Sequence, residues 1–468
     1  MLFPTLTFGW FFLAVFLATW SLQRSNEWRK ILLLAASWVF YGAWDWRFVA
    51  LLILSGILNW GAARLILASG DNERARKAWL ILGIVLNLLI LGFFKYYGFF
   101  MEQVSATLHA IGWERDLYIM EVILPVGVSF FTFQGMSYVI DVFRRQTAPA
   151  SLLDMTLLMS FFPHLVAGPI VRASHLIPQF KEAPRITRGM AAMGVLLIVW
   201  GLFKKSVVAS ELAINFVDPV FFDPSAHSPT DLTFAAYGYA VQIYCDFSAY
   251  SDMAIGLAAL LGYRFPHNFN QPYRARSLQD FWRRWHISLS SWLRDYLYIS
   301  LCGSRHGLTR LCLALGTTML LGGLWHGASW NFVIWGALHG GVLAIERLWR
   351  EFKPKTWPAL PAFLGIIITF HIVLLGWIFF RSHTFADAMA FLGGLGGSAE
   401  SALLTPLMLG LIVFGMALHA LPPRAIQNVA IKVRAMPGVL VGLGIGVLIL
   451  IIDSMRPEGV APFIYYQF

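Results

Sequence analysis

The chain begins MLFPTLTFGWFFLAVFLATW (residues 1–20), a stretch without a single charged side chain. It has no basic residue before its apolar run and no small-residue cleavage site, so we expect it to remain as a first membrane span. Similar runs of about 18 to 25 apolar residues recur along the chain, each long enough to cross about 30 Å of hydrocarbon. We count about eleven or twelve of them. The sequence therefore predicts an all-α fold, a polytopic transmembrane helical bundle.

The composition agrees with a fold solvated largely by lipid. Hydrophobic residues make up 58% of the 468 positions and charged residues 13%, too few to cover the surface of a water-soluble protein. The net charge of +10 is spread over short loops and forms no continuous stripe, so it does not indicate nucleic-acid binding. The expected partner is the lipid bilayer.

The basic residues also predict which loops face the cytoplasm. They cluster at 24–30, 74–77 and 172–188, whereas 218–231 and 382–406 contain no Lys or Arg. Because basic loops stay inside, this alternation places both termini outside. The prediction is a multi-pass membrane protein whose C-terminus lies outside the cytoplasm.

The domain organisation is predicted to be simple. We find no inverted repeat, low-complexity stretch or long linker, so residues 1–468 should form one membrane domain with an extracytoplasmic tail at 456–468. The apolar segment Leu152–Pro169 is interrupted by Pro163 and Gly168. Such an interruption is typical of a re-entrant segment that lines a cavity.

The stretch SLQDFWRRWHISLSSWLRDYLY (residues 277–298) carries its Leu, Phe, Trp and Tyr residues at helical spacing. Its arginines fall on the other side, so it should be an amphipathic helix at the cytoplasmic interface. His286 lies beside the apolar stripe and should point toward the protein. It is either a structural histidine bonded to a backbone carbonyl or a functional one.

A second histidine lies inside the apolar run MLLGGLWHGASWNFVIW (residues 319–335). The small neighbours Gly322, Gly323 and Gly327 leave room around His326. An imidazole is costly to charge in such surroundings, so a neutral His326 could accept a proton from a hydroxyl. The alternative is a histidine that ties helices together by a hydrogen bond.

Other polar groups in apolar stretches could line a cavity or join helices; they include His164, Asp246, Asp252 and Asn331. The three cysteines, Cys245, Cys302 and Cys312, have no paired spacing, so we expect neither a disulfide framework nor a metal site. No metalloprotease, serine-hydrolase or P-loop motif occurs. Any chemistry should be based on histidine.

Four segments together resemble the membrane-bound O-acyltransferase family, in its bacterial polysaccharide branch: FFPHLVAGPIVR (161–172), QIYCDFSAYSDMAIG (242–256), FWRRWHISLSSWLRDYLYI (281–299) and GGLWHG (322–327). They stand in the order typical of that branch. The resemblance implies that His326 is the catalytic histidine and that His286 assists it.

The resemblance also implies an activity, the passage of acetyl groups from cytoplasmic acetyl-CoA toward an exported polysaccharide such as alginate. Acetyl-CoA would be a substrate, and no bound cofactor is expected. The donor, acetyl-CoA, should be bound by basic and aromatic residues of the central stretch, with the arginines attracting its phosphates. These residues are Arg274, Arg276, Arg283, Arg284, Arg294, Trp282 and Trp285. Delivery to sugar hydroxyls would then need a separate periplasmic acetyltransferase of the SGNH type.

The chain ends PFIYYQF, and family members or their companion proteins have a similar aromatic end around a tyrosine. Tyr465 stands in that position and could relay the acyl group, because a phenol with a pKa of about 10 is a good leaving group. Alternatively, the aromatic residues only anchor the terminus at the interface. D-alanine, or acetyl groups for peptidoglycan or cellulose, remain alternative cargoes, and a membrane transporter is the alternative from another class.

Overall fold

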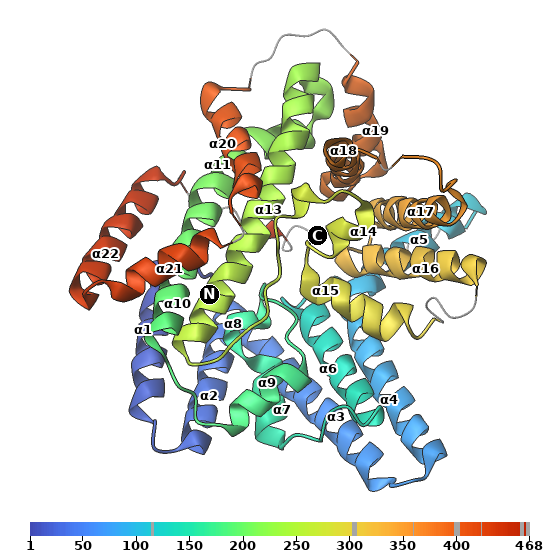
Figure 1. Cartoon of the computed structure of the whole chain (residues 1–468). Coiled ribbons are helices and arrows are strands. Elements are labelled where there is room, and N and C mark those ends of the chain that lie inside the picture. Colours follow the sequence, from blue (N-terminus) through green and yellow to red (C-terminus); the bar gives the residue numbers. More distant parts are fainter. Residues whose placement is uncertain are drawn as a thin grey trace. The chain divides into compact units, whose positions relative to one another are not determined.

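The computed structural model describes residues 1–113, 117–301, 307–358, 360–396, 403–422, 424–458 and 463–464. Within these ranges the regular elements are helices, so the predicted all-α class is confirmed (Figure 1). Contacts divide the chain into two compact units, Met1–Thr187 with Leu257–Pro266, and Arg188–Gly256 with His267–Phe468. The single domain expected for residues 1–468 stays a prediction, and each unit is described by itself.

The first unit consists of nine α-helices and short connecting turns among its described residues: α1 (Leu6–Ser21), α2 (Asn26–Asp45), α3 (Val49–Ala68), α4 (Glu73–Leu91), α5 (Tyr97–Ala110), α6 (Val128–Phe143), α7 (Leu152–Ser160), α8 (Phe162–Leu165) and α9 (Ala173–Lys181). Helices α3 and α4 lie side by side, and α6 packs on both (Figure 1). The Asn87 amide donates to Asn59 across α3 and α4 at 2.9 Å. This buried pair satisfies polar groups that an apolar surrounding would penalise.

The segment that was expected to be re-entrant is interrupted as predicted. Helix α7 ends at Ser160, α8 is one short turn, and the chain continues without regular structure through Pro169. Residues 154–171 are buried throughout. The irregular backbone is therefore surrounded by protein, as such backbone must be in an apolar environment.

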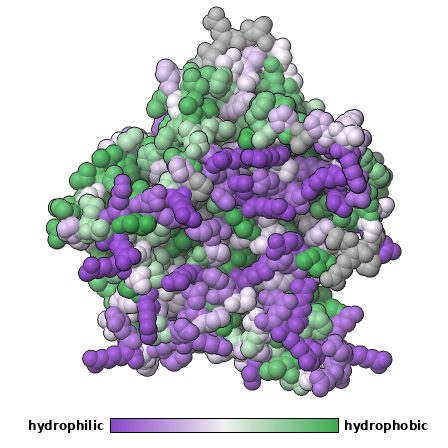
Figure 2. Space-filling model, viewed as in Figure 1, coloured by the Kyte–Doolittle hydropathy of each residue, from purple (hydrophilic) through white to green (hydrophobic). Residues whose placement is uncertain are grey.

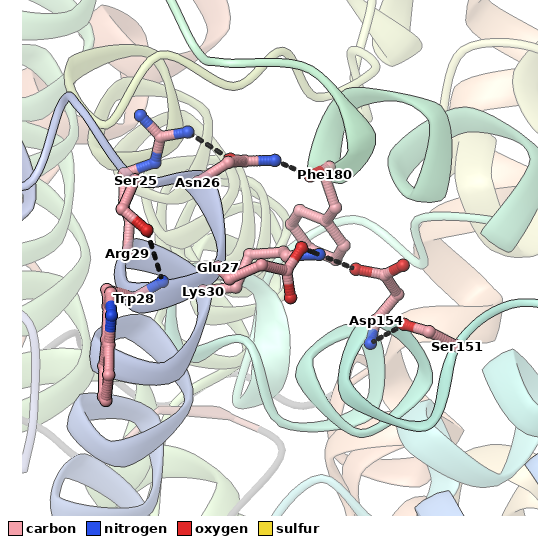
Figure 3. A network of polar contacts seen from close by, with 9 residues as sticks. All are labelled: Ser25, Asn26, Glu27, Trp28, Arg29, Lys30, Ser151, Asp154 and Phe180. Atoms are coloured by element: carbon pink, nitrogen blue, oxygen red, sulfur yellow. Dashed lines mark hydrogen bonds and ion pairs between the residues drawn. The ribbon is translucent and has the colours of Figure 1, made fainter.

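A buried ion pair joins the start of α2 to α7 (Figure 3). Lys30 Nζ lies 2.8 Å from Asp154 Oδ1 and 2.6 Å from Glu27 Oε1. Lys30 and Asp154 are buried, whereas Glu27 is exposed. At the first residue of α2, the side-chain amide of Asn26 donates a hydrogen bond to the Phe180 carbonyl at the end of α9. The first turn of α2 is thus held to two helices that follow more than a hundred residues later.

The second unit consists of α10 (Arg188–Phe203), α11 (Ser210–Leu212), α12 (Asp218–Phe222), α13 (Pro229–Leu260, whose last turn belongs to the first unit), α14 (Leu278–Trp282), α15 (Ile287–Trp292), α16 (Leu308–His326), α17 (Trp330–Phe352), α18 (Ala362–Arg381), α19 (Phe385–Gly394), α20 (Pro406–Ala417), α21 (Ala425–Ala435) and α22 (Gly438–Met455). Two π-helical turns, η3 (Lys204–Ala209) and η7 (Leu293–Tyr298), extend α10 and α15.

Helices α16 and α17 pack side by side in the second unit (Figure 1). A Cβ atom added at Gly336 would lie 2.5 Å from the Met319 carbonyl, and one at Gly340 would lie 3.0 Å from Gly316 Cα. Only glycine fits at these positions without moving the opposite backbone. The glycines therefore bring the end of α16, with His326, against α17.

Six helical segments among the described residues are long and apolar enough to cross a membrane, or up to seven if one bent pair counts as a span. This is fewer than the eleven or twelve expected. Several apolar runs form helices of 10–17 residues, and the α2–α3 segment is one continuous span candidate of 43 residues. Figure 2 shows apolar side chains exposed over α22, where Val439, Leu443 and Leu450 face outward. The chain is a multi-pass membrane protein.

We expect Asp154→Ala to lower the free energy of unfolding by about 3 kcal/mol, because it leaves the buried Lys30 ammonium without its buried partner. The double variant Lys30→Met/Asp154→Leu should recover most of the loss, since it removes both charges. Glu27→Ala, which removes only the exposed partner, should cost less than about 1 kcal/mol. Thermal unfolding in detergent micelles measures these differences. Equal effects of Asp154→Ala and Glu27→Ala would contradict the assignment.

Candidate functional site

Residues 277–298 form two helices separated by a turn. The prediction of a single amphipathic helix over these residues is therefore wrong. Helix α14 ends at Trp282, and α15 begins at Ile287, after His286 in a left-handed conformation with φ 43°. The reason is a long-range backbone pairing that the local pattern does not reveal. The Ile287 N–H donates to the Asn268 carbonyl at 2.9 Å, and the Asn270 N–H donates to the Arg284 carbonyl at 2.9 Å.

Asn268 also organises the polar end of α15. Its Oδ1 accepts from the Ser288 N–H at 3.1 Å and from the Ser288 hydroxyl at 2.9 Å. This side chain therefore satisfies an N-terminal amide of the helix, a role usually taken by the N-cap residue itself. His286 Nδ1 lies 3.3 Å from the same oxygen, so the imidazole orientation is held by Asn268.

The His286 ring is completely buried in the core of the second unit. It meets the edge of Phe247 with ring centroids 4.6 Å apart and lies 6.1 Å from the centroid of Trp325. Burial lowers the pKa of His286 to about 3, because the charged form loses its hydration. The imidazole is therefore neutral at physiological pH.

His326 is the last residue of α16 and is 3% exposed. Its ring lies 5.0 Å from Trp335 on α17 and 5.2 Å from Phe380 on α18, both in edge-on contact. It also lies 5.1 Å from Trp325, the ring that His286 contacts. The structure thus brings the two predicted histidines to one aromatic cluster within the second unit.

A cavity of about 530 Å³ opens beside this cluster and carries four arginines. Its lining includes Gln279, Trp282, Arg283, Arg294, Arg347 and Arg350. Three of the residues predicted to bind a donor are therefore brought together here. Figure 2 shows hydrophilic side chains gathered over α14 and α17, two of the elements around this cavity. Four guanidinium groups favour an anionic ligand, although three of them also pair with a nearby carboxylate: Arg294 with Asp295, Arg347 with Glu351 and Arg350 with Glu346.

Two lining arginines were missed by sequence reasoning. Arg347 and Arg350 lie one turn apart near the end of α17, outside the stretch 274–294 that supplied the predicted donor-binding residues. Their spacing of three residues places them on one helix face. That spacing could have indicated that the two arginines act together. It does not show which other helices this face of α17 packs against.

The remaining residues of the predicted donor set lie outside the lining of the cavity. Arg284 pairs with Asp280 at 2.9 Å, and Arg274 donates to Gln271 at 3.0 Å. Trp285 is buried and stacks on Phe281. The Arg276 backbone packs against Gly365 of α18. These positions stabilise the segment and are not gathered with Arg283 and Arg294.

A pair of tryptophans separates the cavity from His326. Trp282 lines the cavity, contacts Trp335 with centroids 5.6 Å apart, and donates its indole N–H to His339 Nδ1 at 3.2 Å. Trp335 in turn contacts His326. His326 is not among the residues that line the cavity.

The four residues expected to line a cavity are engaged in internal contacts. Asp246 pairs with Lys205 at 2.6 Å and Asp252 with Lys204 at 2.7 Å, and the Asn331 amide donates to the Ser382 carbonyl at 2.8 Å. In the first unit, His164 lies 3.1 Å from the Leu158 carbonyl, beside a crevice too narrow for water. These contacts favour the structural alternative for all four. Tyr465 and Cys302 lie outside the described residues.

Comparison with known proteins agrees with the motifs. The profile of the membrane-bound O-acyltransferase family matches residues 77–385. "Probable alginate O-acetylase AlgI" of Pseudomonas aeruginosa is 43% identical over 391 residues, which cover 82% of this chain and 72% of the relative. "Peptidoglycan O-acetyltransferase" of Helicobacter pylori is 37% identical over 428 residues, 85% of this chain and 80% of the relative. "Teichoic acid D-alanyltransferase" of Bacillus subtilis is 28% identical over 279 residues, 56% of this chain and 69% of the relative.

We expect acid to destabilise the fold through His286. Its pKa is about 3 in the fold and 6.5 when unperturbed, so the unfolded chain binds one more proton between these values and stability falls as pH drops from 6.5 toward 3. The slope attributable to this group approaches about 1.4 kcal/mol per pH unit. His286→Asn, which tolerates the left-handed conformation, should reduce the slope by that amount, while the exposed-site control His383→Asn should not. Parallel pH profiles for the wild type and His286→Asn would refute the assignment.

Proposed function

Because this chain belongs to the membrane-bound O-acyltransferase family and is an O-acyltransferase, we propose that it passes acetyl groups from cytoplasmic acetyl-CoA across the membrane. The acceptor is an exported polysaccharide such as alginate. The names of the relatives that match over most of this chain support both the acetyl group and a polymeric acceptor. Localisation in a bacterial inner membrane follows from the same proposal.

The observation that carries the proposal is the arginine-lined cavity beside the two histidines. Arginine forms bidentate, charge-assisted hydrogen bonds with phosphate oxygens, which coenzyme A carries at its nucleotide end. A volume of about 530 Å³ is within the range of small-molecule sites. Arg283, Arg294, Arg347 and Arg350 hold the phosphates in the proposed complex, and the thioester arm extends past Trp282 toward His326.

In the proposed reaction, neutral His326 accepts the proton of an acceptor hydroxyl while the oxygen attacks the thioester carbonyl. A carbon–oxygen bond forms, the carbon–sulfur bond breaks, and the coenzyme A thiolate leaves and recovers the proton from His326. His286 is held by Asn268 and contacts Trp325, the ring that also contacts His326. In this scheme it positions the thioester. Displacement of Trp282 from Trp335 opens the route in this scheme. An acetyl-histidine intermediate is the alternative course.

On the outer side, Tyr465 is the proposed first acceptor. An acetyl-phenol ester keeps a good leaving group, so the acetyl group can be passed on again. The tail at 456–468 would then face the periplasm, and a separate periplasmic acetyltransferase of the SGNH type would deliver the group to sugar hydroxyls. The bilayer is the other partner in this scheme.

Two variants of this function keep the same fold. One acetylates peptidoglycan, as the name of the Helicobacter pylori relative favours, and cellulose is a further acceptor of the same kind. The other transfers D-alanine, as the name of the Bacillus subtilis relative favours over a shorter match. Membership in an acyltransferase family favours either over a transporter. Product analysis with acetyl-CoA and with a D-alanyl donor separates the two cargoes.

We expect His326→Ala to lower kcat for acetyl transfer by about 100-fold or more, because loss of a general base removes that much of the rate. Release of coenzyme A thiol and formation of acetylated acceptor would be measured on purified protein at matched folded amounts. His383→Ala, at an exposed position after α18, is the matched histidine control. Transfer at the wild-type rate in His326→Ala would exclude it as the base.

We expect Arg347→Ala to raise KM for acetyl-CoA by about tenfold, a loss of about 1.4 kcal/mol, with kcat within about twofold. A phosphate contact distant from the reacting carbonyl is equally strong in the ground state and the transition state. The increase should shrink at high salt, which screens the wild-type attraction. Arg434→Ala, at an exposed position on α21, is the control. An unchanged KM would place the donor elsewhere.

A further inference from the structure

The last described residues of the chain are inserted into the core of the second unit. Phe463 is 0% exposed and Ile464 is 2% exposed. The Ile464 backbone N–H donates to Asp246 Oδ2 on α13 at 2.8 Å. The other oxygen of the same carboxylate, Oδ1, lies 2.6 Å from Lys205 Nζ on η3. The carboxylate therefore joins three segments: α13, η3 and the C-terminal tail.

This contact is a strong one because the ion pair is deeply buried. The side chains of Lys205 and Asp246 are 1% and 3% exposed. A buried carboxylate is stable only when its oxygens are satisfied by a cation and hydrogen-bond donors. The amide of Ile464 supplies one of these donors, and a hydrogen bond to a charged acceptor is about twice as strong as a neutral one.

The neighbouring ion pair provides a contrast. Lys204 and Asp252 come from the same two elements, η3 and α13, and lie 2.7 Å apart. The hydroxyl of Ser248, also on α13, accepts a further hydrogen bond from Lys204 at 2.7 Å. The further hydrogen bond of the Lys204–Asp252 pair is therefore made to a residue of α13. In the Asp246–Lys205 pair, the further hydrogen bond comes from a backbone amide of the tail.

The side chain of Phe463 sets the register of the tail. Its ring centroid lies 4.5 Å from Tyr250 and 5.8 Å from Phe247, both on α13. Phe247 is the ring that meets His286 at 4.6 Å. A one-residue slip of the tail would remove the Phe463 ring from this aromatic pocket and the Ile464 amide from Asp246 together.

We propose that the Asp246–Lys205 pair, with Phe247 and Tyr250, is a docking site for the tail residues Phe463–Ile464 that positions the following residue, Tyr465, for acyl transfer. Docking itself follows from the contacts above, while the positioning of Tyr465 rests on the proposed function. Asp246 and Lys205 are positioning residues in this scheme. They hold the tether point, and a tether point fixed one residue before the acceptor raises its effective concentration at the site.

Docking is tested by hydrogen exchange of the C-terminal peptide, measured by mass spectrometry on the full chain in detergent micelles. The variant Lys205→Met/Asp246→Leu removes both charges at similar volume, a change that folds tolerate, and it deletes the acceptor of the Ile464 amide. We expect this amide to exchange at least tenfold faster. Lys204→Met/Asp252→Leu, the matched change at the neighbouring pair, should leave its exchange unchanged. Wild-type exchange in the first variant, or equal acceleration in both, would overturn the docking site.

Positioning is tested by kinetics on the same proteins. Lys205→Met/Asp246→Leu should keep the wild-type KM for acetyl-CoA and lose at least tenfold in kcat, because the donor cavity is intact while the acceptor is no longer held. A wild-type kcat together with fast exchange would show a purely structural anchor and overturn positioning.

Tyr465→Phe separates this inference from the proposed function. It should keep slow exchange of the Ile464 amide and lose transfer, because docking uses the residues before it. Slow exchange with full transfer would refute the tyrosine relay, and with it the positioning of Tyr465, while leaving the docking site supported.

Discussion

Charges buried in an apolar helical fold must be paired, and this requirement decides which segments of the chain become neighbours. An uncompensated charge in such surroundings costs several kcal/mol, of the order of the whole stability of a domain. In the first unit, one lysine–aspartate pair joins α2 to α7. In the second unit, two consecutive lysines of η3 reach two aspartates of α13, one of which also holds the tail. The pairs connect segments from about 40 to more than 200 residues apart, which apolar packing alone would align only loosely.

Much of the fold class could be predicted from local pattern. Apolar runs of sufficient length predict helices and membrane insertion, and the interruption after Ser160 was visible from proline and glycine. The described residues contain fewer span candidates than the eleven or twelve expected, because some apolar runs form helices of 10–17 residues and others join into one long helical segment. The turn at His286 was missed for another reason. It depends on backbone bonds to Asn268 and Asn270, which no periodicity of 277–298 can show.

The candidate site was predictable in its residues more than in its arrangement. The motifs indicated His326 and His286, and the structure brings both to Trp325. Of the predicted donor-binding residues, Trp282, Arg283 and Arg294 line the cavity. Two arginines of α17, from a different stretch of sequence, line it as well. Grouping by sequence proximity therefore also selected Arg274 and Arg284, which do not line the cavity. Tertiary packing, which sequence spacing does not encode, decides which guanidinium groups share one cavity.

The left-handed backbone at His286 limits what substitution at this position can reveal. Few residue types adopt φ near +43° without strain, and asparagine, aspartate and glycine are the main ones. Alanine there would remove an imidazole and also disfavour the turn that starts α15. The chemical and conformational contributions of this residue are separable only when replacements are compared within the set that keeps the turn. In related chains, the same backbone geometry should limit which residue types occur at the position of His286, independently of any chemical role of the imidazole.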